Sequence, residues 1–485
     1  MSAALEVNNY IDGRLQPPAG DSWLDIHEPA TGLVSGRVAD SNRTDLEQAV
    51  AAATAAAPDW RRAGTEARAR WLHALAELVE GRAEQLAMAE SADTGKPLAL
   101  ARTVDIPRVA ANLRFFAAAA TQFASEAHPM GDVAVNFTLR APLGIVACIS
   151  PWNLPLYLLT WKLAPALAAG NCVVAKPSEL APVSAALFAE LCMEAGLPPG
   201  VLNILHGRGP GIGQLIVDAP EIRAISFTGG TRTGATIAQS AGPAFKKLSL
   251  ELGGKNPSIV FADCDFERTL DGVLRAAFTN QGQVCMCGSR ILVERPIYDR
   301  FRDALVARVR GLRVGDPNEP DTDQGALISA AHRQKVLDCL ALAREEGGRL
   351  LCGGEAVKPP GKRCRAGWFV SPALLEGLPA DCRTNQEEIF GPVATLLPFK
   401  GEDEAVALAN GVPYGLAASI WSRDVGCCHR VAARVEAGLV WVNCWMVRDL
   451  RTPLGGTKDS GVGREGGFEA MRFFTEPKNV CVSYD

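Results

Sequence analysis

Cys285 has the local surroundings that a catalytic nucleophile needs. It lies in the stretch 278–290, after a glycine-containing turn and before a strand-like run from Arg290 to Val293. A sulfur at the end of an element can be partly exposed beside backbone N–H groups, which favour the reactive thiolate. Free cysteines are nevertheless among the most buried residue types, so each of the fourteen cysteines is by default a core residue. Cys285 therefore needs support from other motifs.

The neighbouring Cys287 opens a second interpretation, in which the two cysteines bind a metal or exchange a disulfide. Zinc-binding cysteines are usually separated by about two to four residues. No second pair in the chain would complete a tetrahedral site. We therefore expect no metal site, and a thiol-redox function of the pair stays open.

Two further residues would complete a site for acyl chemistry. Glu251 lies near the end of a strand-like run, and Asn153 lies between two prolines in the stretch 151–155. A carboxylate can act as a general base toward water, and an amide can donate a hydrogen bond to an alkoxide. Read alone, Glu251 is a surface glutamate at a strand end and Asn153 is a turn residue.

A glycine-containing stretch, 227–234, indicates where a dinucleotide would bind. It follows a strand and leads into an expected helix, Thr233 to Gln239, so backbone N–H groups and the positive end of a helix dipole would face a pyrophosphate. The spacing is not the usual G-x-G-x-x-G, and glycines after a strand are most often only a turn. Lys176 and Glu179, read alone, are a solvated surface pair.

Taken together, these motifs resemble the aldehyde dehydrogenase superfamily. The resemblance rests on the glutamate stretch 248–257 and the cysteine stretch 278–290, and several further motifs occur in the family's order along essentially the whole chain. Such a coincidence is far more specific than any single motif. The resemblance implies that Cys285 attacks an aldehyde carbonyl, that Asn153 stabilises the alkoxide, and that Glu251 activates water to hydrolyse the thioester.

The resemblance also implies NAD as the cofactor. Lys176 and Glu179 match the family positions that bind the adenosine ribose, where a carboxylate would repel the 2′-phosphate of NADP. Glu388 and Phe390 match the positions that hold the nicotinamide ribose and ring. The complete set of cofactor-binding residues that we expect is Ile149, Ser150, Pro151, Trp152, Lys176, Ser178, Glu179, Gly209, Phe227, Thr228, Gly229, Gly230, Gly234, Leu252, Glu388 and Phe390.

Two segments bear on the substrate. The tract 105–108 begins a helix, and the loop 443–451 precedes Pro453; in the superfamily these regions line the substrate entrance. Arg108 and Arg448 in these segments would bind a carboxylate, with Asn153 also contacting the substrate, because a guanidinium pairs with a carboxylate bidentately. They could equally be solvated charges, and Asp449 could neutralise one of them.

Within the superfamily, the sequence most resembles the dehydrogenases of 2-aminomuconate and 2-hydroxymuconate semialdehydes. This resemblance implies oxidation of a carboxylate-bearing semialdehyde to the dicarboxylic acid, in aromatic or tryptophan catabolism. Glu251 favours hydrolysis, because members that transfer the acyl group to coenzyme A lack this glutamate. Leu454, where phenylalanine is usual, and Cys287 depart from the common pattern and bear on the shape of the substrate tunnel.

Other functions remain as alternatives. A betaine aldehyde or broad aliphatic aldehyde dehydrogenase would share the same core, although arginines at the entrance would repel a quaternary ammonium group. A structural protein on the same fold would have no need of Cys285 or Glu251, and both are present. A thiol-redox protein would use Cys285 and Cys287.

The order of predicted elements favours an α/β fold. Helices over 44–57, 65–90 and 106–124 follow an initial hairpin at 9–14, and a capping box at Thr44 to Glu47 would open the first helix. Five strand-like runs then alternate with helices, as in a parallel doubly wound sheet: 144–150, 172–176, 201–206, 224–227 and 248–252. A second α/β region begins after Pro257, with a strand at 258–261 and helices over 265–280, 297–310 and 330–346.

We therefore expect a Rossmann-type NAD-binding domain, residues 1–120 and 143–253, and an α/β catalytic domain, residues 254–453. Residues 133–139 alternate between apolar and polar types as a half-exposed strand does. By resemblance, this segment belongs to a small β oligomerisation arm, residues 121–142 and 469–485, in which the strand-like 472–482 pairs with it. The resemblance thus implies a homodimer or homotetramer.

Composition excludes several classes of function. A net charge of −5 over 485 residues leaves no basic footprint for nucleic acid. Residues 1–20 have neither the basic start nor the apolar core of a leader, and no apolar run approaches the ~20 residues that span a bilayer. Irregularly spaced cysteines, including the adjacent Cys427 and Cys428, suit a reducing compartment. We expect a cytoplasmic enzyme that acts on a small molecule, without nucleic acid or membrane partners.

Overall fold

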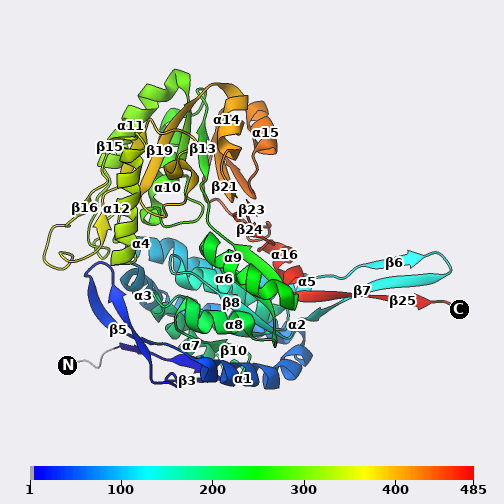
Figure 1. Ribbon diagram of the computed structural model, residues 1–485. Helices are drawn as coiled ribbons and strands as arrows, with labels where there is room; N and C mark the ends of the chain where they lie inside the picture. The colour runs from blue at the N-terminus through cyan, green and yellow to red at the C-terminus, as the bar shows by residue number, and fades with distance from the viewer. Residues whose placement is uncertain (1–4) are drawn as a thin grey trace.

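The computed structural model describes residues 5–485 and shows two lobes and a projecting arm (Figure 1). Residues 1–4, which belong to the N-terminal stretch expected to lack a leader and to the first expected domain, lie outside the described part. No helix within residues 5–485 is long and apolar enough to cross a membrane.

The lower lobe is built on an eight-stranded sheet with the order β24-β12-β11-β8-β9-β10-β2-β3. Its central five strands are parallel, which confirms the prediction from the alternating elements. The expected hairpin at 9–14 is also present, as the antiparallel pair β2 and β3 at one edge. The strands are β2 (Asn9–Ile11), β3 (Arg14–Gln16), β8 (Ile145–Ile149), β9 (Cys172–Lys176), β10 (Leu202–Ile204), β11 (Ile222–Thr228), β12 (Lys247–Glu251) and β24 (Gly461–Val462).

The strand order places a ligand-binding crevice at a definite point of this sheet. The chain adds β9 and β10 on one side of β8 and then returns to add β11 and β12 on the other side. In open parallel sheets, ligands bind beyond the carboxyl ends of the strands at such a reversal. The segments that follow β8 and β11 therefore border the crevice.

Helices cover both faces of the sheet (Figure 1). One face carries α6 (Pro155–Ala168) and α7 (Val183–Glu194), and the other carries α1, α8 (Gln214–Asp218) and α9 (Thr231–Ala241). Almost every residue of α6 is buried, because α2 and α5 pack on its outer side. The connection from β10 to β11 is shorter than the expected long helix: it is the π-helical turn η2 (Gly209–Gly213) followed by α8.

The N-terminal helices differ from the sequence-based expectation in two details. The capping box lies two residues earlier than predicted: Asn42 caps α1 and Asp45 reaches back to its N–H. The expected single helix over 65–90 is two helices that meet at Arg82, whose backbone is not helical. The elements are α1 (Arg43–Arg62), α2 (Gly64–Gly81), α3 (Ala83–Thr94), α4 (Leu98–Leu100), η1 (Ala101–Asp105) and α5 (Ile106–Gln122), beside a small sheet of β1 (Leu5–Val7), β5 (Leu33–Ala39) and β4 (Trp23–Glu28).

The upper lobe contains a seven-stranded sheet with the order β15-β18-β19-β14-β13-β21-β22. Its strands are β13 (Pro257–Val260), β14 (Arg290–Glu294), β15 (Arg349–Cys352), β18 (Ala373–Glu376), β19 (Val393–Phe399), β21 (Ala417–Trp421) and β22 (Leu439–Val442). Its helices are α10 (Phe266–Phe278), α11 (Tyr298–Arg310), α12 (Ala330–Glu345), α13 (Arg383–Gln386), α14 (Gly401–Asn410) and α15 (Val425–Arg434). The short segment between β12 and β13 joins the carboxyl end of one sheet to the amino end of the other.

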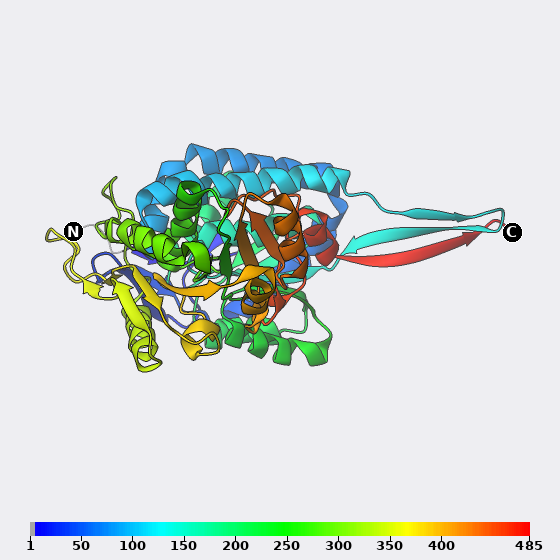
Figure 2. The same ribbon diagram turned by 90° about the horizontal axis from the view of Figure 1, so that it is seen from above.

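The arm is a three-stranded sheet that projects from the lower lobe (Figure 2). It consists of β6 (Ala127–Met130), β7 (Ala134–Pro142) and the C-terminal β25 (Thr475–Ser483), which follows α16 (Gly467–Phe473). The predicted pairing is confirmed, because β25 runs antiparallel to β7 from Thr475↔Pro142 to Ser483↔Ala134.

Candidate active site

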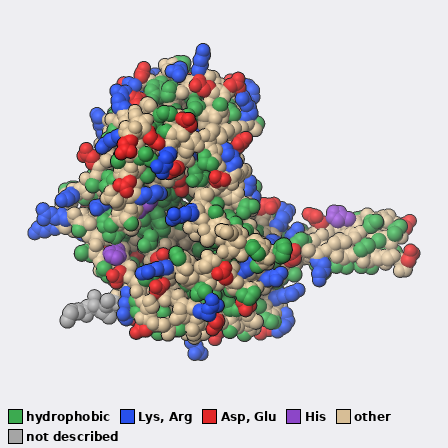
Figure 3. Space-filling model, viewed as in Figure 1, with side chains coloured by type: hydrophobic (Ala, Val, Ile, Leu, Met, Phe, Trp, Pro, Cys, Tyr) green, Lys and Arg blue, Asp and Glu red, His purple; other side chains and the backbone are tan. Residues whose placement is uncertain are grey.

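The site lies where the two lobes meet, and the space-filling view shows a hollow between them with Lys and Arg side chains at its edge (Figure 3). Two openings lie near the catalytic turn, residues 279–289. We call them the nucleotide cleft, on the lower lobe, and the entrance pocket, between α5 and α10.

The backbone of the catalytic turn is held in an unusual conformation. After α10, the 3₁₀ turn η4 (Thr279–Gly282) contains two residues other than glycine with left-handed backbone, Asn280 and Gln281, both at φ 54°. Such residues cost ~1–3 kcal/mol each and persist only where surrounding contacts fix them. The Gln283 side chain provides one such contact by accepting a hydrogen bond from the Ile328 N–H at 3.1 Å. The turn therefore delivers Cys285 to the amino end of β14.

Cys285 is half-buried, whereas Cys287 is buried. The Asn256 side chain donates to the carbonyl oxygens of both cysteines, at 2.8 and 2.9 Å, and so fixes the turn to the segment between the sheets. Cys287 packs in an apolar cluster with Val284 and Trp441. Burial holds the pKa of the Cys287 thiol well above its usual range. Of the two thiols, only Cys285 is placed to meet a substrate.

The surroundings of Cys285 disfavour its thiolate form. Desolvation and the neighbouring carboxylates of Glu388 and Glu251 raise its pKa to about 12, while Arg448 and the residue's own backbone N–H act in the opposite direction. Positive charge that approaches the sulfur would thus favour the thiolate. Arg448 already supplies such a positive charge, because it lowers the pKa of both Cys285 and Glu251.

Asn153 is brought directly to the catalytic turn. It follows β8, is buried, and its side-chain nitrogen donates to the Gln283 carbonyl at 2.9 Å. Its own carbonyl accepts from Lys96 Nζ at 2.9 Å and from Asn280 Nδ2 at 3.2 Å. Because an Asn amide has two N–H donors, one remains for an oxygen at the reacting centre.

A buried ionic cluster supports the Asn153 loop from below. Lys96 is fully buried, donates to Asp105, and lies 3.7 Å from Glu90. Glu90 in turn accepts the N–H of Leu156 in the first turn of α6, at 2.8 Å. Removing one partner of a buried charge cluster costs ~3–5 kcal/mol, because the others stay buried and uncompensated. Sequence reasoning missed this cluster, although its members lie between residues 90 and 105, because the π-helical turn that ends at Asp105 brings this carboxylate against Lys96.

Glu251 ends β12 at the carboxyl edge of the lower sheet and is buried. Its Oε1 atom has no hydrogen-bond partner among residues 5–485. Desolvation, followed by the nearby Glu465, raises the pKa of Glu251 well above its usual range, and Lys162, Arg464 and Arg448 partly offset this. A buried carboxylate with a raised pKa is suited to accept a proton.

The nucleotide cleft has a volume of about 590 Å³ and lies at the strand reversal. Twelve of the sixteen expected cofactor-binding residues line it, and the cleft also contains residues that sequence reasoning missed, on η2, α8 and α9. The expected ones are Ile149, Ser150, Pro151, Trp152, Lys176, Ser178, Glu179, Gly209, Phe227, Thr228, Gly229 and Gly230; the additional ones are Pro210, Gly213, Gln214, Val217, Arg232, Thr233, Thr236 and Ile237.

The remaining four expected residues lie beside the cleft. Gly234 and Leu252 pack against each other, and a Cβ on Gly234 would lie 2.5 Å from the Leu252 side chain. Glu388 accepts the Gly254 N–H at 3.1 Å and, with Phe390, lines a small cavity beside Val284 and Cys287. Phe390 stacks edge-on against Trp152, with ring centroids 5.3 Å apart, so this cavity adjoins the cleft.

The cleft has the features that a dinucleotide requires. Gly230 precedes α9, whose first-turn N–H groups point toward the cleft, and a side chain at Gly230 would meet nothing within 4 Å. The Ser150 hydroxyl, which lines the cleft, is buried without a hydrogen-bond partner among the described residues. Lys176 Nζ lies 3.1 Å from Glu179, whose carboxylate is half-exposed in the lining of the cleft.

The entrance pocket, of about 600 Å³, lies on the other side of the catalytic turn. Arg108 lines it, with its guanidinium 5.7 Å from the centre of the Tyr157 ring. Arg448 reaches the same tyrosine and donates to its hydroxyl at 3.2 Å. The lining residues are Leu100, Thr103, Val104, Asp105, Pro107, Arg108, Ala111, Leu154, Tyr157, Arg275, Thr279, Asn280, Val284, Trp445 and Met446.

Neither arginine is neutralised. Asp449, considered as a partner for one of them, instead pairs with Arg451 at 2.6 Å. Within residues 5–485 no carboxylate lies within 4 Å of the guanidinium of Arg108 or Arg448. Sequence reasoning missed Tyr157, although it stands only four residues after Asn153, in the first turn of α6.

The chain matches the aldehyde dehydrogenase family over residues 16–480. It belongs to that family. The 2-aminomuconic semialdehyde dehydrogenase of Mus musculus is 47% identical over 99% of both chains. The 2-hydroxymuconic semialdehyde dehydrogenase of Pseudomonas sp. (strain CF600) is 45% identical over 98% of this chain and 99% of its own. The NAD⁺ complex of an aldehyde dehydrogenase from Bacillus cereus superposes with a TM-score of 0.96 at 36% identity, covering 99% of this chain and 97% of that one.

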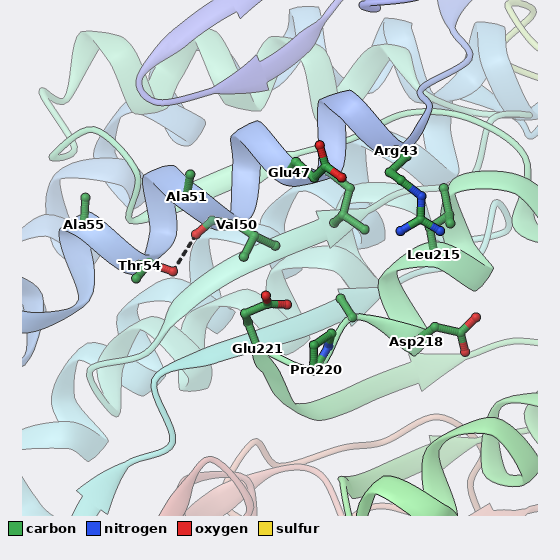
Figure 4. Close-up of a pocket in the computed structure, with 12 residues that line it drawn as sticks. Arg43, Glu47, Val50, Ala51, Thr54, Ala55, Leu215, Asp218, Pro220 and Glu221 are labelled. Atoms are coloured by element: carbon green, nitrogen blue, oxygen red, sulfur yellow. Dashed lines mark hydrogen bonds between the residues drawn. The ribbon is translucent and has the colours of Figure 1, made fainter.

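This aldehyde dehydrogenase has one larger groove that shares no residue with either opening. It has a volume of about 720 Å³ and lies between α1 and the segment from α8 to β11 (Figure 4). Its charged lining residues have both signs, with Arg43 beside Glu47, Asp218 and Glu221. Because three of these four residues are acidic, the groove would not favour a carboxylate-bearing ligand, and it shares no residue with the catalytic site.

Proposed function

We propose that this aldehyde dehydrogenase oxidises a semialdehyde that bears a carboxylate, of the 2-aminomuconic or 2-hydroxymuconic type, to the dicarboxylic acid with NAD⁺. The observation that carries the proposal is the pair of arginines without a carboxylate partner, Arg108 and Arg448, which both reach Tyr157 in the wall of the entrance pocket. The names of the relatives agree with this charge preference. The roles of Cys285, Asn153, Glu251 and Glu179 belong to the same proposal.

Cys285 begins the reaction. Its thiolate forms a bond to the aldehyde carbon, and the carbonyl electron pair moves to oxygen to give a thiohemiacetal alkoxide. The Asn153 side chain and the Cys285 backbone N–H donate hydrogen bonds to this oxygen. The cofactor, when bound in the nucleotide cleft, supplies the acceptor for the hydride that leaves as the alkoxide collapses to a thioester.

Glu251 completes the reaction. It takes a proton from water, the resulting hydroxide attacks the thioester carbon, and the carbon–sulfur bond breaks to release the acid and regenerate Cys285. Because Glu251 can activate water, release of the acid needs no second thiol to accept the acyl group. Hydrolysis to the free acid is therefore favoured over transfer to coenzyme A.

Glu179 favours NAD over NADP. Its carboxylate is held by Lys176 at the end of the cleft where a ribose would bind. A 2′-phosphate there would meet like charge. The NAD⁺ complex of the Bacillus cereus relative supports the same choice.

The arm would join copies of this chain into a dimer or tetramer. Its thin sheet exposes large apolar side chains that a neighbouring copy would cover: Met130, Val133, Leu139, Val482 and Tyr484. Light scattering on the wild type and on a Val133→Asp/Leu139→Asp variant would test this, because the variant should shift toward smaller assemblies. An unchanged mass would contradict a role for these side chains.

A panel of aldehydes with NAD⁺, followed by NADH absorbance, tests the substrate proposal. We expect a higher kcat/KM for 2-hydroxymuconic semialdehyde than for hex-2-enal, a neutral aldehyde of similar length, and the lowest value for betaine aldehyde. Arginines at the entrance repel the quaternary ammonium group of betaine aldehyde. A preference for hex-2-enal or betaine aldehyde would contradict the proposal.

A further inference from the structure

The entrance pocket holds more positive charge than a substrate with one carboxylate uses. Its wall contains two arginines, Arg108 from α5 and Arg275 from α10, and Arg448 donates a hydrogen bond to Tyr157 of the same wall. The one carboxylate in the lining is Asp105, which is fully buried and bonded to Lys96. A single carboxylate is satisfied by one or two guanidiniums.

Arg275 is free to meet a ligand. It is exposed in the last turn of α10, and within residues 5–485 no carboxylate lies within 4 Å of its guanidinium. The acid one turn earlier, Asp271, would be its natural partner on the helix, at a spacing of i to i+4. Asp271 instead accepts from Arg308 at 2.7 Å, and Arg308 also binds Glu267 at 2.9 Å. The acids of α10 are thus held by α11, away from Arg275.

We propose that Arg275 is a specificity-determining residue that binds a second carboxylate, so that the enzyme accepts muconic-type semialdehydes with two carboxylates as well as one. This inference rests on the proposed function, in which Arg108 and Arg448 bind the first carboxylate. Arg275 comes from α10 of the upper lobe, whereas Arg108 comes from α5 of the lower lobe and Arg448 from the loop after β22, and Arg275 lines the same pocket as Arg108. A second carboxylate on the substrate chain would point toward it.

The size and polarity of the pocket fit such a substrate. About 600 Å³ lies within the range of pockets that hold drug-sized ligands, which is more than a six-carbon chain fills. The lining around the arginines adds no negative charge, because it includes the hydroxyl groups of Thr103 and Thr279 and the apolar side chains of Val104 and Met446. Because Arg275 is solvent-exposed, its contribution is that of a screened ion pair and weakens as salt is added.

The test compares 2-hydroxymuconic semialdehyde, its 5-carboxymethyl derivative and hex-2-enal, which carry one, two and no carboxylates. The holoenzyme is assayed as wild type, Arg275→Gln and Arg275→Lys. Arg344→Gln is the matched control, because Arg344 is also exposed, lies in the last turn of α12, and lines neither opening. Thermal unfolding of each variant checks that the fold is intact.

We expect Arg275→Gln to lower kcat/KM for the two-carboxylate substrate by ~2- to 5-fold relative to the one-carboxylate substrate, through KM. Arg275→Lys should retain most of this preference, and Arg344→Gln should change none of the three values. The preference of the wild type for the second carboxylate should shrink as NaCl is added.

Two results would overturn the inference while leaving the proposed function intact. Equal losses on the one- and two-carboxylate substrates would mean that Arg275 shares the first carboxylate, and no loss on either would mean that Arg275 binds neither. Equal losses on all three substrates would show damage to the pocket and would also overturn it. A wild type that favours hex-2-enal over both charged substrates would instead refute the proposed function itself.

Discussion

The nucleotide cleft and the entrance pocket lie near the same catalytic turn but are built by different means. The cleft is formed largely by the loops after β8, β9 and β11 and by the N-terminus of α9, with glycines where the ligand must approach the backbone. The entrance pocket is formed by side chains from α5, α6, α10 and the loop after β22, including arginines without acidic partners.

The difference shows which part of the enzyme can change without loss of the fold. Backbone recognition in the cleft is tied to the strand order, so it constrains the whole lower lobe. Charge recognition in the entrance pocket depends on a few side chains at the surface of packed helices. Substrate preference should therefore be alterable by single substitutions that leave cofactor binding unchanged.

The largest expected effect comes from Cys285, the half-buried thiol of the catalytic turn. Cys285→Ala should reduce NADH formation at least ~10³-fold, because no other thiol is placed to attack the aldehyde. Binding of NAD⁺, measured by calorimetry, should persist, since the cleft is built from other residues. Cys287→Ala is the matched control. Loss of activity in Cys287→Ala, with activity retained in Cys285→Ala, would reverse the assignment and favour thiol-redox chemistry.

Glu251→Gln separates the two halves of the reaction. Acylation and hydride transfer should proceed once, giving a burst of about one equivalent of NADH, while steady turnover falls ~10²-fold for lack of a base. Mass spectrometry should find an acyl adduct on Cys285.

The pH dependence of hydrolysis in the wild type should also be set by Glu251. A base must be deprotonated, and burial raises the Glu251 pKa, so the hydrolysis rate should rise with pH through that raised pKa. The pH-dependent rise should vanish in Glu251→Gln. In the burst experiment with Glu251→Gln, a missing burst together with a missing acyl adduct would show that Glu251 acts before acylation.

The variant Glu179→Gln tests whether a negative charge in the nucleotide cleft contributes to the choice between NAD⁺ and NADP⁺. Glu179→Gln should narrow the preference for NAD⁺ over NADP⁺ by ~10-fold, because the like charge facing a 2′-phosphate is removed. The ratio of kcat/KM for the two cofactors measures this, with the aldehyde held saturating. An unchanged ratio would place the discrimination elsewhere in the cleft.

Tyr157→Phe gives the smallest and most local effect. It removes the hydroxyl that accepts from Arg448 and keeps the ring beside Arg108. Loss of one hydrogen bond that orients Arg448 should raise KM for 2-hydroxymuconic semialdehyde ~2- to 10-fold and leave hex-2-enal unaffected. Equal changes for both aldehydes would indicate that the hydroxyl supports the pocket wall instead.

The sequence was sufficient where chemistry follows the ends of strands. Asn153, Lys176, Gly229 and Glu251 each stand at or just beyond the end of a strand, and parallel strands bring such positions to one edge. The alternation of short apolar runs with helices was enough to predict the lower sheet, and the alternating residues 133–139 were enough to predict the arm strand.

The sequence was insufficient where contacts depend on irregular backbone or join distant segments. The Lys96 cluster depends on the π-helical turn η1, which places Asp105 against Lys96, and such a turn has no clear pattern in the chain. The convergence of Arg108 and Arg448 on Tyr157 spans residues 108 to 448, so spacing could not reveal it. Helix boundaries such as Arg82 and the Asn42 cap were misjudged because neighbouring residues offer equally good local signals.

The most direct test of the account is the ratio of kcat/KM for 2-hydroxymuconic semialdehyde to that for hex-2-enal, measured for wild type, Arg108→Ala and Arg448→Ala. A hydrogen bond between charged groups is worth ~1.5–3 kcal/mol, so each substitution should lower the ratio by ~10- to 150-fold. The value for hex-2-enal alone should stay nearly unchanged in Arg108→Ala, and in Arg448→Ala it should fall less than the value for the charged aldehyde, because Arg448 also favours the charged forms of Cys285 and Glu251. Equal losses on both aldehydes would contradict the account, because they would show that these arginines support the fold and do not bind the carboxylate.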